Sequence, residues 1–151
     1  MKKIIYFSLA LFNLNILAIT PPKKTKSVIE FKELIINNKI NAVEVFKKEI
    51  NNPGLIVVKF SAKWCGPCNA YTPTFDAVAK ANPEVKIDDK TSIAVKYYAI
   101  DIDEYQTVAF FCKIRPIPAV FFYKNGKLLE VLIGKQNEKV LTDKIKQLAK
   151  S

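Results

Sequence analysis

The chain has 151 residues, of which 50% are hydrophobic and 25% are charged, the balance of an ordinary globular protein. A chain of this length is expected to form one domain that buries a core without disulfide staples. The formal net charge is +10, but the lysines are scattered and no basic arm with interleaved aromatic residues is present, so the charge indicates a solvated surface and argues against nucleic-acid binding.

The first eighteen residues have the composition of a secretory signal. Lys2 and Lys3 precede an apolar run over residues 4–17, and Ala18 supplies a small residue at a cleavage position. The run is short for a membrane span, which needs about 20 residues. We therefore expect a cleaved signal peptide and a secreted or periplasmic protein, with an uncleaved N-terminal membrane anchor as the alternative.

Residues 19–27 contain two prolines and three lysines and predict a linker, so the folded domain is expected over residues 28–151. Apolar periodicity places the elements of this domain. The pattern of residues 28–40 is ambiguous between strand and helix, with 28–34 as the candidate first strand. Further strands are predicted at 55–60, 92–100, 119–123 and 127–133, helices at 42–50, 65–81, 105–112 and 137–150, and a charged loop at 84–91. Asn125-Gly126, between the last two strands, is a strong hairpin signal. This order predicts an α/β fold with a mixed sheet covered by helices on both faces.

The most informative stretch is Trp64-Cys65-Gly66-Pro67-Cys68, where a predicted buried strand meets a predicted helix. Backbone N–H groups and the positive dipole end of a helix N-terminus stabilise a thiolate, so Cys65 is expected to be the attacking sulfur. Cys68 lies one turn further on and is close enough to resolve a mixed disulfide formed at Cys65. Pro67 suits the first turn, because its missing N–H would have no partner there.

Other interpretations of the cysteine pair are weaker. A zinc site takes four ligands, and the chain has only three cysteines and no histidine, so no metal is expected. A purely structural disulfide would close too small a loop to remove much chain entropy. The lack of histidine also excludes Cys-His and Ser-His-Asp catalysis, and without a phosphate-cradling glycine loop no nucleotide or flavin cofactor is expected. The third cysteine, Cys112, is expected to be a small buried hydrophobe rather than a regulatory thiol.

The pentapeptide resembles the active site of the thioredoxin family, whose W-C-G-P-C it matches letter for letter. The similarity extends over roughly residues 41–149 and includes a proline within the helix, at Pro73. It implies a thioredoxin fold, a cis peptide bond at Ile117-Pro118 and a protein-disulfide oxidoreductase. The residues that the resemblance places at the client protein are Trp64, Gly66, Pro67, Ile117, Pro118 and Gly134.

One departure from the family stands close to the cysteines. Thioredoxins usually carry a buried acid six residues before the first active-site cysteine, thought to take the proton of the resolving cysteine, and here that position is Lys59. The usual lysine partner of that acid is replaced by Tyr97. A positive charge at Lys59 would favour thiolates, stabilise the reduced pair and give a more oxidising couple than a standard thioredoxin.

The sequence thus predicts an exported thiol-disulfide reductase that exchanges disulfides with client proteins through Cys65 and Cys68. Its electrons would come from another dithiol, either membrane-borne or soluble, and we expect a monomer. Two alternatives stay open: an exported dithiol oxidant or isomerase, and a thioredoxin-like binding module with little redox turnover.

Overall fold

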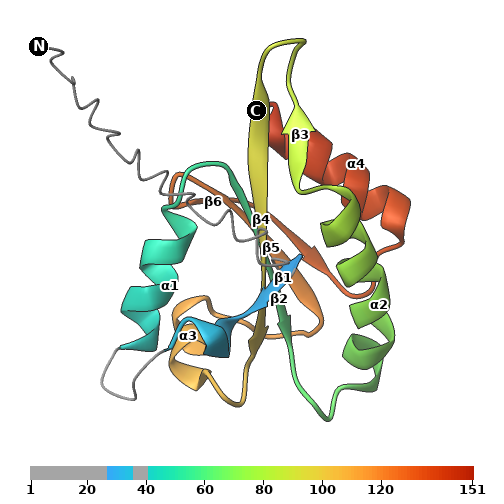
Figure 1. The fold of residues 1–151 in the computed structure, drawn as a ribbon. Helices are drawn as coiled ribbons and strands as arrows, with labels where there is room; N and C mark the ends of the chain where they lie inside the picture. The colour runs from blue at the N-terminus through green and yellow to red at the C-terminus, as the bar shows by residue number, and fades with distance from the viewer. Residues whose placement is uncertain (1–26, 36–40) are drawn as a thin grey trace, which may run out of the picture.

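The computed structural model describes residues 27–35 and 41–151, and Figure 1 shows a central sheet with helices on both sides. The strands are β1 (Val28–Glu30), β2 (Leu55–Ser61), β3 (Glu84–Lys86), β4 (Ser92–Asp101), β5 (Ala119–Lys124) and β6 (Lys127–Ile133). The helices are α1 (Ala42–Ile50), α2 (Gly66–Ala81), α3 (Gln106–Phe111) and α4 (Glu138–Ala149), with a short 3₁₀ helix, η1 (Phe31–Glu33).

The strand order is β1-β4-β2-β5-β6, and β3 pairs with β4 outside this path. β1, β4 and β2 run parallel, whereas β5 is antiparallel to β2 and β6 is antiparallel to β5. The predicted mixed sheet is therefore confirmed. Asn125 and Gly126 both have positive φ in the β5–β6 turn, as the Asn-Gly hairpin signal requires.

Two hydrophobic cores lie on opposite faces of the sheet, because successive side chains of β2 alternate between them. Leu55 and Val57 pack with α2 and α4, while Ile56, Val58 and Phe60 pack with α1 and α3. Figure 1 shows these helix pairs on the two sides of the sheet. By the same alternation, Lys59, which follows Val58 in β2, points toward α2 and into the first core.

The structure differs from the sequence prediction in two short segments. Residues 84–86, expected in a loop, form β3, which pairs antiparallel with the start of β4 and buries Val85. The first strand ends at Glu30, earlier than predicted, because Phe31 turns into the core within η1. Both segments are only three residues long, too short for periodicity to separate strand from loop.

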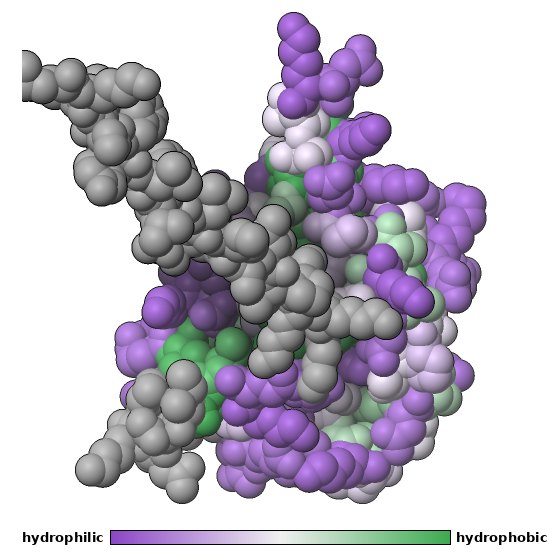
Figure 2. All heavy atoms as spheres, viewed as in Figure 1, coloured by the Kyte–Doolittle hydropathy of each residue, from purple (hydrophilic) through white to green (hydrophobic). Residues whose placement is uncertain are grey.

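The predicted signal over residues 1–18 and all of the predicted linker except Ser27 lie outside the described residues. Within residues 27–35 and 41–151, no helix is long and apolar enough to cross a membrane. On the face seen in Figure 2, hydrophilic side chains cover most of the β3–β4 end of the sheet and alternate with weakly apolar ones over α2 and α4, which agrees with a solvated charged surface.

Candidate active site

The two cysteines of the motif lie where β2 leads into α2. Cys65 is the N-cap of α2, with extended backbone, and its N–H donates to the carbonyl of Ala62 at 3.1 Å. Its Sγ accepts a hydrogen bond from the backbone N–H of Cys68 at 3.2 Å. The sulfur of Cys65 therefore takes the place of an oxygen in an ordinary N-cap, where unpaired amides and the helix dipole stabilise a negative charge.

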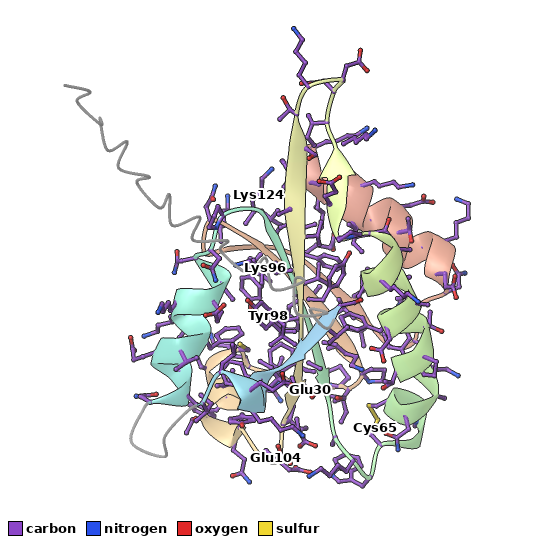
Figure 3. All side chains as sticks on the ribbon, viewed as in Figure 1. Glu30, Cys65, Lys96, Tyr98, Glu104 and Lys124 are labelled. Atoms are coloured by element: carbon purple, nitrogen blue, oxygen red, sulfur yellow. A yellow bond between two sulfur atoms is a disulfide. The ribbon has the colours of Figure 1, made fainter. Side chains whose placement is uncertain are left out.

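Cys65 and Cys68 form a disulfide, with an S–S distance of 2.02 Å and a Cα–Cα distance of 5.2 Å. Figure 3 shows it at the N-terminal end of α2. Cys65 is 5% exposed and Cys68 1%, so an incoming thiolate reaches Cys65 first. This order of access agrees with the predicted roles, in which Cys65 attacks and Cys68 resolves.

Trp64 projects into solvent beside the disulfide, with 70% of its surface exposed. Its indole Nε1 donates to the carboxylate of Asp103 at 2.7 Å. Asp101 fixes the loop that carries Asp103, since its carboxylate accepts backbone N–H groups from Asp103 at 2.9 Å and Glu104 at 3.3 Å. The indole is thus held in one orientation, with its apolar face available to a client. The sequence analysis missed Asp103, because a partner 39 residues away leaves no local signal.

The segment before β5 approaches the cysteines from the other side. The Ile117-Pro118 bond is cis, as the resemblance implies, and Ile117 packs against the cluster of Ala62, Cys65 and Cys68. The backbone N–H of Gly134 donates to the carbonyl of Pro118 at 2.8 Å. The residues predicted to face a client therefore gather around the disulfide from α2, the start of β5 and the end of β6.

Lys59 is almost fully buried at 3% exposure, on the side of β2 that faces α2. Its Nζ donates to Thr72 Oγ1 at 3.0 Å and lies 5.1 Å from the centroid of the Phe75 ring. Burial lowers the pKa of the Lys59 amine, and the carboxylates of Asp76 and Glu30 partly oppose this effect.

Thr72 links this amine to the resolving cysteine. Its hydroxyl donates to the backbone carbonyl of Cys68 at 3.1 Å while accepting the hydrogen bond from Lys59. The sequence analysis did not single out Thr72, although a threonine four residues after Cys68 in a helix is a known geometry for such a bond. Tyr97, at the position of the family's lysine, instead donates to the carbonyl of Asn82 at 2.7 Å.

Cys112 lies apart from the disulfide and packs at the edge of the second core. Its Sγ is 3.8 Å from the hydroxyl of Tyr123, and burial raises the pKa of the thiol to about 11. A thiol with so high a pKa is almost entirely protonated at neutral pH and therefore unreactive. This environment agrees with the prediction of a small apolar side chain.

Three features occur together: a disulfide whose first cysteine caps a helix, a cis-proline segment beside that disulfide, and this sheet topology. Together they define a dithiol protein-disulfide oxidoreductase. The family model described as thioredoxin matches residues 37–147. Thioredoxin from Gallus gallus is 38% identical over 105 residues, which cover 68% of this chain and 90% of that protein. The chain belongs to the thioredoxin family.

Solved structures of thioredoxins have the same fold. The crystal structure of thioredoxin from Trypanosoma brucei brucei matches with a TM-score of 0.67 at 24% identity, over 88% of this chain and 100% of that chain. Thioredoxin NaTrxh from Nicotiana alata matches with a TM-score of 0.62 at 25% identity, over 83% of this chain and 95% of that chain. The predicted thioredoxin fold is confirmed.

Proposed function

We propose that this chain is an exported reductase of protein disulfides that works through Cys65 and Cys68. The observation that carries the proposal is the position of the Cys65 sulfur, at the N-terminus of α2 between the exposed indole of Trp64 and the packed side chain of Ile117. A helix N-terminus stabilises the attacking thiolate, and the two apolar side chains provide contact for a client.

The exchange proceeds in two steps. The thiolate of Cys65 attacks one sulfur of a client disulfide, a bond forms between Cys65 and the client, and the client's other sulfur leaves as a thiolate and takes a proton. The thiolate of Cys68 then attacks the sulfur of Cys65 and releases the client's second sulfur. The client gains two electrons and two protons, Cys65 and Cys68 become a disulfide, and another dithiol must reduce them again.

The reduction potential tests the direction of this exchange. We would equilibrate the purified protein with glutathione buffers and quantify the fraction of the Cys65–Cys68 disulfide. A value near about −270 mV supports a reductase. A value toward about −120 mV contradicts it and supports an oxidant, the alternative that the buried Lys59 favours.

The alternative of a binding module is separated from exchange by the variant Cys68→Ser. An exchange enzyme without its resolving thiol should hold clients covalently through Cys65, in complexes that dithiothreitol releases. The matched control is the double variant Cys65→Ser/Cys68→Ser, which should hold none. Partners that bind both variants equally, without a covalent bond, would contradict exchange and support a binding module.

We propose export on the composition of residues 1–18, with Lys2 and Lys3 before an apolar run and Ala18 after it. The test is to express the chain in a bacterium with two membranes, fractionate the cells and sequence the N-terminus. A periplasmic protein that begins at residue 19 supports a cleaved signal. A full-length protein in the membrane fraction supports an anchor, and recovery only from the cytoplasm contradicts export. A variant that lacks residues 2–18 is the control.

A further inference from the structure

An apolar groove lies beside the cis-proline segment, on the face of the sheet that also carries α1 and α3. Its volume is about 250 Å³, and it runs between residues 113–116 and the strands β5 and β6. Ile114, Pro116, Phe121 and Ile133 contribute to its apolar lining, and Ile133 remains 49% exposed. This volume is smaller than that of pockets for drug-sized ligands, about 300–1,000 Å³, and is sufficient for a smaller group such as one apolar side chain.

The groove adjoins the active site, because the chain segments that line it lead directly into the segments that border the cysteines. Pro116 directly precedes the Ile117-Pro118 bond that borders the cysteines. Across the β5–β6 hairpin, Ile133 is the register partner of Ala119 and is followed by Gly134, which donates to Pro118. An extended client whose sulfur reaches Cys65 therefore passes the groove with residues a few positions from its cysteine, since a strand advances about 3.3 Å per residue.

Two cations flank this apolar lining. Lys113 and Arg115 are exposed and line the groove, and no carboxylate of residues 27–35 and 41–151 lines it. Within the described residues, neither side chain forms an ion pair or a hydrogen bond. On the Trp64 side of the disulfide, by contrast, Lys63 is paired with Glu104. Unpaired positive charge therefore lies beside the groove, and it complements an acidic partner.

We propose that this groove is a client-selecting subsite, which takes an apolar side chain with a neighbouring carboxylate from an extended segment of the client. The subsite rests on the proposed function, because it selects among disulfides that Cys65 attacks. The apolar side chain occupies the space between Ile114, Phe121 and Ile133. The carboxylate pairs with Lys113 or Arg115.

The test uses reduced Cys68→Ser protein and peptides that carry one cysteine as its thionitrobenzoate disulfide. Cys65 thiolate attacks the peptide sulfur, the new S–S bond forms as the old one breaks, and thionitrobenzoate leaves with the electron pair and is measured by its absorbance. One peptide, Leu-Glu, has Leu at the third and Glu at the fifth position on each side of its cysteine, because residues two apart lie on one face of an extended segment. The other peptide, Leu-Lys, has Lys in place of Glu. Cys112 does not compete, because the pKa of its thiol is raised to about 11.

We expect the Leu-Glu peptide to react about fivefold faster than the Leu-Lys peptide, the size of effect that surface ion pairs produce. In the same background, Lys113→Glu/Arg115→Glu should abolish or reverse this ratio. The matched control is Lys86→Glu/Lys90→Glu, which changes the net charge equally at the β3–β4 end of the sheet, opposite Cys65 in Figures 1 and 3. A ratio that collapses equally in the control would overturn the subsite, because general electrostatic steering would then explain it.

A second pair of peptides tests whether the groove binds the apolar side chain. A peptide with Ala-Glu in place of Leu-Glu should react about threefold more slowly, and Ile133→Ser should remove this difference. Leu128→Ser is the control, because Leu128 is 43% exposed on the same strand but does not line the groove. Persistence of the difference in Ile133→Ser would show that the groove does not hold the leucine.

Two further outcomes separate the proposals. If the reduced wild-type protein reduces hydroxyethyl disulfide but all peptides react at one rate, the subsite is wrong and the proposed function stands. If it reduces neither, both are wrong. If Lys113→Glu/Arg115→Glu instead loses cosedimentation with phosphatidylglycerol vesicles while the peptide ratio is unchanged, the groove is a lipid-contacting surface and the subsite is overturned.

Discussion

Replacement of Lys59 by methionine should make the reduction potential of the Cys65–Cys68 pair more negative. Two hydrogen bonds, of 3.0 Å and 3.1 Å, connect the Lys59 amine through the Thr72 hydroxyl to the backbone carbonyl of Cys68. At an effective dielectric constant of about 20, a unit charge about 8 Å from a thiolate stabilises it by about 2 kcal/mol. For a two-electron couple, this energy corresponds to about 40 mV. Lys59→Asp should shift the potential further in the same direction.

The pH dependence gives this prediction a second observable. The pKa of Lys59 is lowered by burial, so the amine loses its proton at a lower pH than an exposed lysine does. The potentials of wild type and Lys59→Met should therefore differ between the pH at which a thiolate forms and the pKa of Lys59, and they should converge as pH rises through that pKa.

The assay is equilibration with glutathione buffers between about pH 5 and pH 9. Lys63→Met is the control: Lys63 is 80% exposed and paired with Glu104, so solvent screens its charge and the potential should hardly change. Equal potentials for wild type and Lys59→Met across the whole range would refute the reasoning.

Three further substitutions test packing by chemical denaturation. Tyr71→Phe should stabilise the protein by about 1 kcal/mol, because the buried Tyr71 hydroxyl has no hydrogen-bond partner within the described residues. Tyr97→Phe should destabilise it by about 1 kcal/mol, since the Tyr97 hydroxyl donates to Asn82 and its loss leaves that carbonyl unpaired; opposite signs would contradict this account. Gly54→Ala should cost more than about 1 kcal/mol, because φ is +100° and the new Cβ would lie 2.3 Å from the carbonyl oxygen of Ala94.

The sequence predicted most of the fold because its signals are local. The predicted helix at 42–50 has the observed bounds, and its N-cap, Asn41, accepts a hydrogen bond from the N–H of Val43 as capping chemistry requires. The predicted helix at 65–81 begins one residue later, because Cys65 is the cap rather than the first helical residue. This small shift matters, since it places the Cys65 sulfur against an unpaired amide.

The features that sequence analysis missed depend on long-range geometry. β3 exists because β4 extends far enough to pair with it, and its three residues carry no pattern of their own. The bond from Trp64 to Asp103 joins two loops that the sheet brings together. The groove at Ile114 and Ile133 likewise forms only once β6 lies beside the segment before β5.

Burial, more than total charge, determines which basic residue influences the disulfide. The chain has 24 lysines and arginines. Most of those within residues 27–35 and 41–151 are exposed, and solvent screens their effect on a thiolate. Lys59 differs because the alternation of β2 turns it into the core, where Thr72 and the Phe75 ring are its nearest partners and the neighbouring carboxylates only partly offset its desolvation. A charge in that environment acts on Cys68 through a low dielectric. The replacement of a family acid by Lys59 is therefore the feature of this sequence that bears most directly on the direction of exchange.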